Sequence, residues 1–218
     1  NICHAVELVK TAGFSNFGLD LIAAIPGMTK ECWKQSLEKA VALSPTHISI
    51  YNLSIEEGTP FSQQGVVPIG DDDAMEQLAL AQSVLNVAGY GRYEISNYAK
   101  SGKESRHNLK YWNCEEYLGL GPAAHSFFRG NRFSFLRHMD RYMNGLEMPG
   151  AAIRLTEQSD TVSPRERLGE YIMLRFRLRE GLNCRDFARL FGFSFEDLYG
   201  KKRAPYVKNG FATGKNGV

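Results

Sequence analysis

One carboxylate, Asp20, stands inside a segment that is otherwise almost entirely apolar, Phe17 to Ile25. Such a run is typical of a strand that is buried on both faces of a parallel sheet. Burying an unpaired carboxylate costs at least ~2 kcal/mol, so Asp20 needs a partner or a cavity. A structural aspartate bonded to nearby backbone is one interpretation. Because polar residues toward the carboxyl ends of barrel strands line ligand sites, we favour a cavity-lining role.

Five further polar residues lie on or just after the next two predicted strands, namely Asn52, Ser54, Glu56, Glu94 and Asn97. Loop residues of this kind either satisfy local backbone groups or contact a ligand. For these five side chains both interpretations remain equally open.

The segment Arg106 to Trp112 places an imidazole, His107, beside the aromatic rings of Tyr111 and Trp112. A neutral imidazole can ligate iron, and flat rings can cover a flat macrocycle. The chemistry alone favours a plainer interpretation, in which this is a turn whose aromatic side chains pack on the rim of a barrel.

A glycine-rich segment, Gly119 to Phe127, follows closely. An isolated G-x-G is a weak phosphate signal, and Pro122 removes a backbone donor that a phosphate cradle would use. We interpret the segment as a tight turn that lets backbone approach a ligand or a neighbouring strand. His125 within it is more commonly a hydrogen-bonded core residue than a ligand.

The segments that must position these residues alternate between the apolar spacing of a helix and that of a strand. Apolar strands are predicted at 17–25, 47–53 and 92–98, and a helix precedes each of them. Repeated alternation of this kind indicates parallel βα units. Three units would leave bare sheet edges, so we expect further units before Asn1.

The rest of the chain is predicted to be helical. Ser163-Pro-Arg-Glu166 is a capping box with proline at the first helical position, and shorter helices follow Asn183 and begin at Phe195. The predicted fold class is α/β, the C-terminal part of a parallel (β/α) partial barrel followed by a small helical, winged-helix-like domain. The predicted domains are 1–135, which includes the His107 segment, a linker at 136–160, and an incomplete helical domain at 161–218.

Composition limits the alternatives. The chain has 218 residues and a formal net charge of +2, too small to demand a nucleic acid or an anionic membrane as partner. Five arginines raise a nucleic-acid alternative, but glutamates interleave with them and we predict a solvated face; they are Arg165, Arg167, Arg175, Arg177 and Arg179. No apolar run reaches the length of a membrane span.

The four cysteines, Cys3, Cys32, Cys114 and Cys184, are scattered singly and outside metal-ligand spacing. A reduced, cytoplasmic setting is the expectation. Both ends of the sequence look cut, so we expect a fragment of a longer protein.

The ordered segments resemble a known family. They are Leu19-Asp-Leu-Ile22, Ile25-Pro-Gly-Met-Thr29, Ile48-Ser-Ile-Tyr-Asn-Leu53, Glu56-Glu-Gly-Thr-Pro60, Tyr93-Glu-Ile-Ser-Asn-Tyr98, Glu104-Ser-Arg-His-Asn-Leu-Lys-Tyr-Trp112, Tyr117-Leu-Gly-Leu-Gly121 and Ala124-His-Ser-Phe127. Together they resemble the radical S-adenosylmethionine (SAM) family of oxygen-independent coproporphyrinogen III oxidase-like proteins. The H-N-x-x-Y-W signature and E-x-G-T-P favour its haem chaperone branch.

The resemblance implies cofactors and contact residues. Family members hold a [4Fe–4S] cluster with three cysteines, and the cluster binds and reductively cleaves SAM. Asp20 matches a SAM contact position, and Ser54 and His125 match two further ones. The haem-associated motif corresponds to His107, Asn108, Tyr111 and Trp112, with His107 as the iron ligand. No residue of this chain is assigned a catalytic role.

The chain departs from the family pattern, because the C-x-x-x-C-x-x-C cluster motif and the first barrel units are absent. Truncation explains this gap better than degeneration, and the chain is not expected to be active alone. We predict a fragment of a haem chaperone whose partners are haem and haem-accepting proteins, without nucleic acid. The alternative is oxygen-independent coproporphyrinogen III oxidase, which acts in haem synthesis, and a distant one is a nucleic-acid-binding module.

Overall fold

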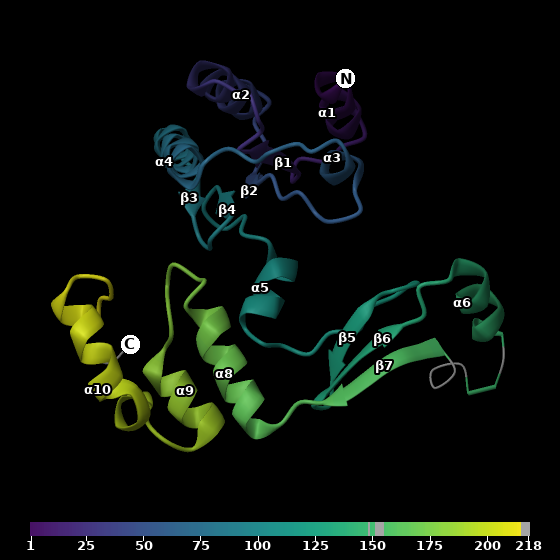
Figure 1. Cartoon of the computed structure of the whole chain (residues 1–218), viewed down its shortest axis with the longest axis vertical. Helices are drawn as coiled ribbons and strands as arrows, with labels where there is room; N and C mark the ends of the chain where they lie inside the picture. The colour runs from purple at the N-terminus through teal and green to yellow at the C-terminus, as the bar shows by residue number, and fades with distance from the viewer. Residues whose placement is uncertain (148, 151–154, 215–218) are drawn as a thin grey trace. The chain divides into compact units, whose positions relative to one another are not determined.

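The structure is a computed structural model that describes residues 1–147, 149–150 and 155–214 (Figure 1). It divides into two compact units, 1–106 and 107–218. The sequence-based domains 1–135, 136–160 and 161–218 remain a prediction, and parts of the last two fall outside the described residues. No helix within the described ranges is both long and apolar enough to span a membrane.

The first unit contains a four-stranded sheet in the order β1-β2-β4-β3. Its strands are β1 (Gly18–Ala23), β2 (His47–Asn52), β3 (Gly91–Arg92) and β4 (Asn97–Ala99). β1 and β2 are parallel, as expected for a βα unit, whereas β4 runs antiparallel to both β2 and β3.

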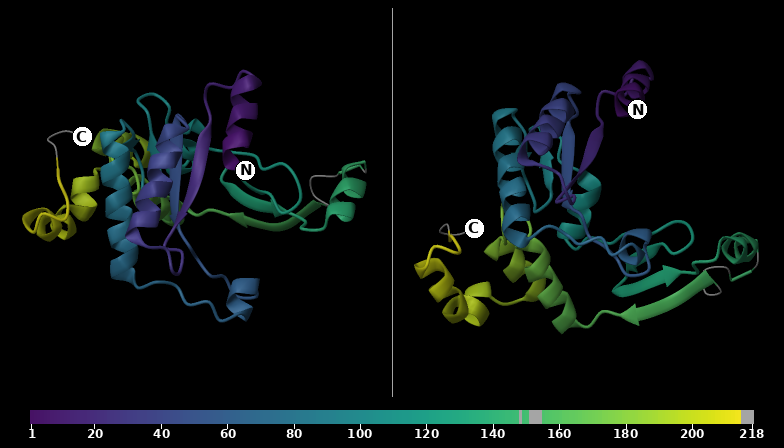
Figure 2. Two further views of the ribbon diagram at one scale, coloured as in Figure 1. Left: turned by 90° about the horizontal axis from the view of Figure 1, so that it is seen from above. Right: turned by 45° about the horizontal axis from the view of Figure 1, so that its top comes forward.

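Helices cover one face of this sheet. The unit contains α1 (Ile2–Thr11), α2 (Lys30–Ala42), α3 (Pro60–Gln63) and α4 (Asp71–Val87). Figure 2 shows α2 and α4 running alongside the strands. Trp33 and Leu37 of α2 and Leu85 of α4 pack with Ile48 and Ile50 of β2 to form the core. Thr29 caps α2, and three aspartates open α4 at the positive end of its dipole.

Two predictions about the strands are wrong. The segment 17–25 is not buried on both faces, because β1 is an edge strand along which exposed and half-buried residues alternate. The segment 92–98 is not one parallel strand but the antiparallel hairpin β3–β4. The Arg92 guanidinium stabilises its turn by donating to the carbonyls of Glu94 and Ile95.

The second unit contains a sheet that the sequence did not predict. The strands β5 (His125–Phe128), β6 (Asn131–Phe135) and β7 (Thr156–Thr161) are antiparallel in the order β5-β6-β7, and α6 (Met139–Leu146) lies between β6 and β7 in sequence. All of β7 except Thr161 falls inside the predicted linker. Its sequence is polar throughout and its side chains are mostly exposed, so no buried alternation marks it as a strand.

The C-terminal helices follow the prediction closely. They are α8 (Pro164–Arg175), α9 (Cys184–Phe191) and α10 (Phe195–Lys208). The Ser163–Glu166 capping box is formed, and α9 ends at Gly192 in the left-handed conformation, φ 79°. Phe187 is fully buried, and Tyr171, Leu182 and Phe195 pack around it. These aromatic contacts fix the helices to one another.

Candidate functional site

A row of polar residues crosses the sheet of the first unit. Asp20 on β1 is paired in register with Ser49 on β2, and Ser49 is paired with Asn97 on β4. Residues paired across strands present their side chains on the same face. Leu21, Ile48 and Tyr98 occupy the opposite register and belong to the core. The sheet therefore has one apolar face under α2 and α4 and one face that carries this polar row.

The polar row contains an unused acceptor. Asn97 is only 3% exposed, and its Oδ1 has no hydrogen-bond partner among the described residues. Ser49 is also buried. A buried amide oxygen without a partner is costly and calls for a ligand or water. Sequence reasoning missed Ser49, because only the strand register places it between Asp20 and Asn97.

A second group of polar residues lies beside this row. The Nε2 atom of His47 lies 2.8 Å from the Tyr93 hydroxyl, and the two rings meet edge to face. Burial lowers the pKa of His47, against smaller opposite effects of Asp20, Glu94 and Glu104. Glu94 is buried and accepts a hydrogen bond from the Ser96 amide at 3.0 Å. These interactions tie His47 to Tyr93, and Glu94 to the backbone of the hairpin at Ser96.

The other predicted residues of this unit are differently placed. Asp20 is exposed, which corrects the expectation of a buried carboxylate; β1 is an edge strand and Asp20 lies on its uncovered face. Ser54 is exposed just beyond the carboxyl end of β2 and donates to Glu56 at 2.6 Å. Asn52 is the exposed last residue of β2.

The His107 segment forms a helix rather than a turn. α5 (Arg106–Trp112) places His107 and Tyr111 one turn apart on the same face. The Nε2 atom of His107 lies 3.2 Å from the Tyr111 hydroxyl, and the rings meet edge to face with centroids 5.1 Å apart. Tyr111 in turn packs edge to face against Tyr117 at 4.7 Å. His107 itself is exposed and thus open to a ligand.

Trp112 lies one position further around α5. The Arg177 guanidinium stacks over its indole, 4.9 Å from the ring centroid. The indole Nε1 is buried and has no hydrogen-bond partner among the described residues. Asn108, one turn before Trp112, is half-buried. His107 and Trp112 therefore lie on different faces of α5. His107 is exposed to solvent, whereas Trp112 packs against Arg177.

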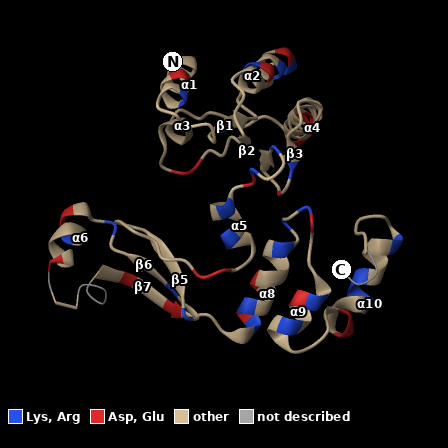
Figure 3. Ribbon diagram, turned by 180° about the vertical axis from the view of Figure 1, so that it is seen from behind, with Lys and Arg blue, Asp and Glu red and all other residues tan. Residues whose placement is uncertain are grey.

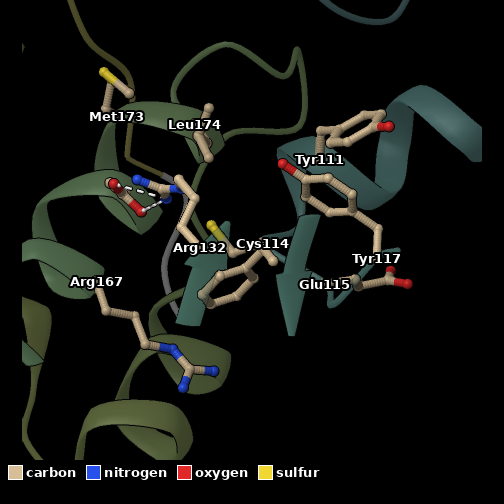
Figure 4. A pocket seen from close by; sticks show the side chains of 10 residues that line it. Tyr111, Cys114, Glu115, Tyr117, Arg132, Arg167, Met173 and Leu174 are labelled. Carbon is tan, nitrogen blue, oxygen red and sulfur yellow. Dashed lines mark hydrogen bonds and ion pairs between the residues drawn. The ribbon is translucent and has the colours of Figure 1, made fainter. Parts of the chain in front are cut away.

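A cavity of about 320 Å³ opens beside Tyr111 (Figure 4). Tyr111 and Tyr117 form one side, and Arg132, which donates to both carboxylate oxygens of Glu170 at 3.0 and 2.9 Å, forms the other. That hydrogen bond raises the pKa of Arg132. Burial raises the pKa of Cys114, which also lines the cavity, to about 11, so its thiol stays protonated at neutral pH.

The glycine-rich segment behaves as predicted, except for its histidine. A side chain at Gly119 would collide with the His125 carbonyl, and the Gly119 amide donates to Ser126 Oγ at 2.9 Å, so the turn does let two segments approach closely. His125 is not a core residue, because it is exposed at the start of β5 and paired with Ser134.

The arginines of the tail also differ from the prediction in part. Figure 3 shows basic and acidic residues interleaved along α8 and α9. Arg175, however, is only 9% exposed, donates to Asn113, and forms an ion pair with Glu180 at 2.6 Å. A solvated face therefore does not describe Arg175, which joins α8 to the segment after α5.

An iron–sulfur cluster does not fit the residues that the structure describes. Cys3 and Cys32 are exposed and far apart in sequence, and Cys114 and Cys184 each pack against the helical core. No group of three His, Cys, Asp or Glu side chains in the described ranges could hold a metal ion. A [4Fe–4S] cluster requires clustered thiolates, which these four scattered cysteines do not provide.

Comparison with known proteins gives concordant matches. Residues 162–217 match the family model described as HemN C-terminal domain. The Lactococcus lactis protein named heme chaperone HemW is 33% identical over 205 residues, which are 92% of this chain and 53% of the relative. The Escherichia coli heme chaperone HemW is 32% identical over 96% of this chain and 54% of its own length. The chain thus spans about half the length of these curated relatives.

A solved structure matches the fold of nearly the whole chain. It is described as coproporphyrinogen III oxidase (HemN) from Escherichia coli, a radical SAM enzyme, and it gives a TM-score of 0.79 at 15% identity. The match covers 99% of this chain and 53% of that one. The shared fold confirms the predicted fold class, an α/β chain that corresponds to part of the HemN fold. The chain is thus similar over most of its length to proteins named heme chaperone HemW, and over residues 162–217 to the HemN C-terminal domain.

Proposed function

We propose that the protein to which this chain belongs binds haem as cargo and delivers it to haem-accepting proteins. The observation that carries the proposal is the exposed His107 imidazole, which is hydrogen-bonded to Tyr111 beside a cavity lined by aromatic side chains. The names of the curated relatives, heme chaperone HemW, support the same cargo. The setting proposed for this delivery is the cytoplasm.

His107 is proposed as the iron ligand. A ligating histidine usually uses its second ring nitrogen for a hydrogen bond that fixes tautomer and orientation. If Nε2 donates to the Tyr111 hydroxyl, the lone pair lies on Nδ1, and this atom faces the iron. Asn108, Tyr111 and Trp112 complete the proposed haem contacts, with Trp112 acting through its stack with Arg177.

The polar sheet face is proposed as part of a SAM site. Asp20 on β1 and Ser54 just beyond the carboxyl end of β2 would contact the cofactor, and His125 is proposed as a third contact. The buried, unpaired oxygen of Asn97 fits this proposal because it offers an acceptor in the same row as Asp20, with Ser49 between them. Bound SAM would supply an ammonium group for acceptors of this kind. Its reductive cleavage would require a cluster held outside this chain.

The second candidate is coproporphyrinogen III oxidation, the activity in the description of the solved structure. The match of residues 162–217 to the HemN C-terminal domain supports this second candidate. The H-N-x-x-Y-W segment and the curated relatives favour the chaperone.

One preparation of reconstituted full-length protein tests both candidates. Haem titration followed by addition of a haem-free acceptor protein should show stoichiometric binding and then transfer. The same sample, given coproporphyrinogen III under anaerobic reducing conditions, should show no decarboxylation. Robust turnover without haem binding would replace the chaperone proposal with the enzyme.

A further inference from the structure

The cavity beside Tyr111 contains a cation without a partner. Arg167, on α8, lines it together with Phe127, Met173 and Leu174. Within the part of the chain that the structure describes, the Arg167 guanidinium makes no hydrogen bond or ion pair. Arg132 is different, because Glu170 already neutralises it.

The other walls of the cavity suit a flat apolar body. Tyr117 and Phe127 contribute aromatic rings, and Met173 and Leu174 contribute aliphatic surface. At about 320 Å³ the cavity is at the small end of ligand pockets, so it would receive one edge of a tetrapyrrole and not the whole of it. His107 adjoins this cavity through its bond with Tyr111.

We propose that this cavity binds the propionate-bearing edge of haem, with Arg167 as the residue that pairs with a propionate carboxylate. The inference rests on the proposed haem function and assigns it a residue that the H-N-x-x-Y-W motif does not contain. A guanidinium presents a planar fork of donors that matches a carboxylate, and the apolar surroundings strengthen the pair. Arg167 would therefore orient the macrocycle, while His107 binds the iron.

Iron-free protoporphyrin IX and its dimethyl ester separate these two contributions. Neither ligand can use His107 as an axial ligand, and only the free acid offers carboxylates. The chain should bind the free acid about tenfold more tightly than the ester, in the same detergent-containing buffer. Arg167→Gln should remove that difference by weakening the free acid alone. Arg165→Gln, two residues earlier on α8 and outside this cavity, should leave it unchanged.

Fluorescence quenching gives both affinities. Equal affinities of the wild-type chain for acid and ester, or an Arg167→Gln variant that keeps the preference, would overturn the inference. Haem that still binds through His107 under that outcome would leave the proposed function standing. Failure of the wild-type chain to bind haem or either porphyrin would remove both proposals together.

Discussion

The two units of the chain carry their candidate groups in different ways. In the first, Asp20, Ser49 and Asn97 come from three strands and meet only through the sheet register. In the second, His107 and Tyr111 come from one turn of α5. Groups gathered by register are held by the whole sheet, whereas groups on one helical turn depend on local packing. The proposed SAM site has the first arrangement, and the proposed haem ligand has the second.

The two tryptophans show the same contrast. Trp33 is 1% exposed in the core of the first unit, and its Nε1 donates to the Gln77 carbonyl at 2.9 Å. Trp112 is half-buried, and its Nε1 has no partner among the described residues. The Trp33 indole is fully hydrogen-bonded within the fold, whereas the indole of Trp112, itself a proposed haem contact, has a buried donor without a partner among the described residues.

Replacing each tryptophan with alanine should give the largest effect, a clear difference between the two losses of unfolding free energy. Trp33→Ala should cost about 3–5 kcal/mol of unfolding free energy, because it removes a buried ring and a satisfied hydrogen bond. Trp112→Ala should cost about 1–3 kcal/mol, because less surface and no indole hydrogen bond are lost. Urea unfolding followed by circular dichroism measures both. Equal losses would make Trp112 an ordinary core residue.

The reactivity of the Cys114 thiol tests how far solvent enters the cavity beside Tyr111. The pKa of Cys114, raised to about 11, leaves roughly 100-fold less reactive thiolate at pH 8 than a pKa of 9 would. Iodoacetamide should therefore modify exposed Cys32 much faster than Cys114, as peptide mass spectrometry can measure. The difference should vanish in urea. Comparable rates in the folded chain would show that solvent reaches Cys114 freely.

A substitution on the sheet face should affect only SAM. In the reconstituted full-length protein, Asp20→Asn should weaken SAM binding about tenfold, since it removes a charge from the polar row. Haem affinity should not change. Asp73→Asn, on the exposed first turn of α4, is the matched control. If calorimetry gives an unchanged SAM dissociation constant, Asp20 is structural.

The smallest expected effect concerns acid stability. Burial lowers the pKa of His47, so the folded chain binds this proton less readily than the unfolded chain. The stabilising contribution is complete above the usual pKa of 6.5 and is lost as pH falls through the folded pKa. Melting temperature should drop between about pH 7.5 and about pH 5.5, and His47→Gln should reduce the drop. An identical drop in the variant would exclude His47 as its source.

Local signals explain what the sequence could predict. A helix cap acts within a few residues, and the capping box predicted at Ser163 and Glu166 is formed in the structure. The spacing of His107 and Tyr111 is local as well. The motif could therefore be proposed before its helix was known.

Long-range pairing explains what the sequence could not predict. The polar row needs the registers of β1, β2 and β4, and β7 becomes a strand only through its pairing with β6. Arg132 and Arg167 line one cavity although 35 positions separate them in the sequence. Composition and periodicity carry no information about such contacts.

The central claim, that α5 carries the iron ligand of a haem cargo, is tested most directly by one spectrum. Haem added to His107→Ala should give a Soret band shifted from that of the wild-type chain and weaker binding, because the axial ligand is lost. His125→Ala and His138→Ala should give the wild-type spectrum. A wild-type spectrum and affinity in His107→Ala, with the shift appearing in His125→Ala instead, would contradict the account.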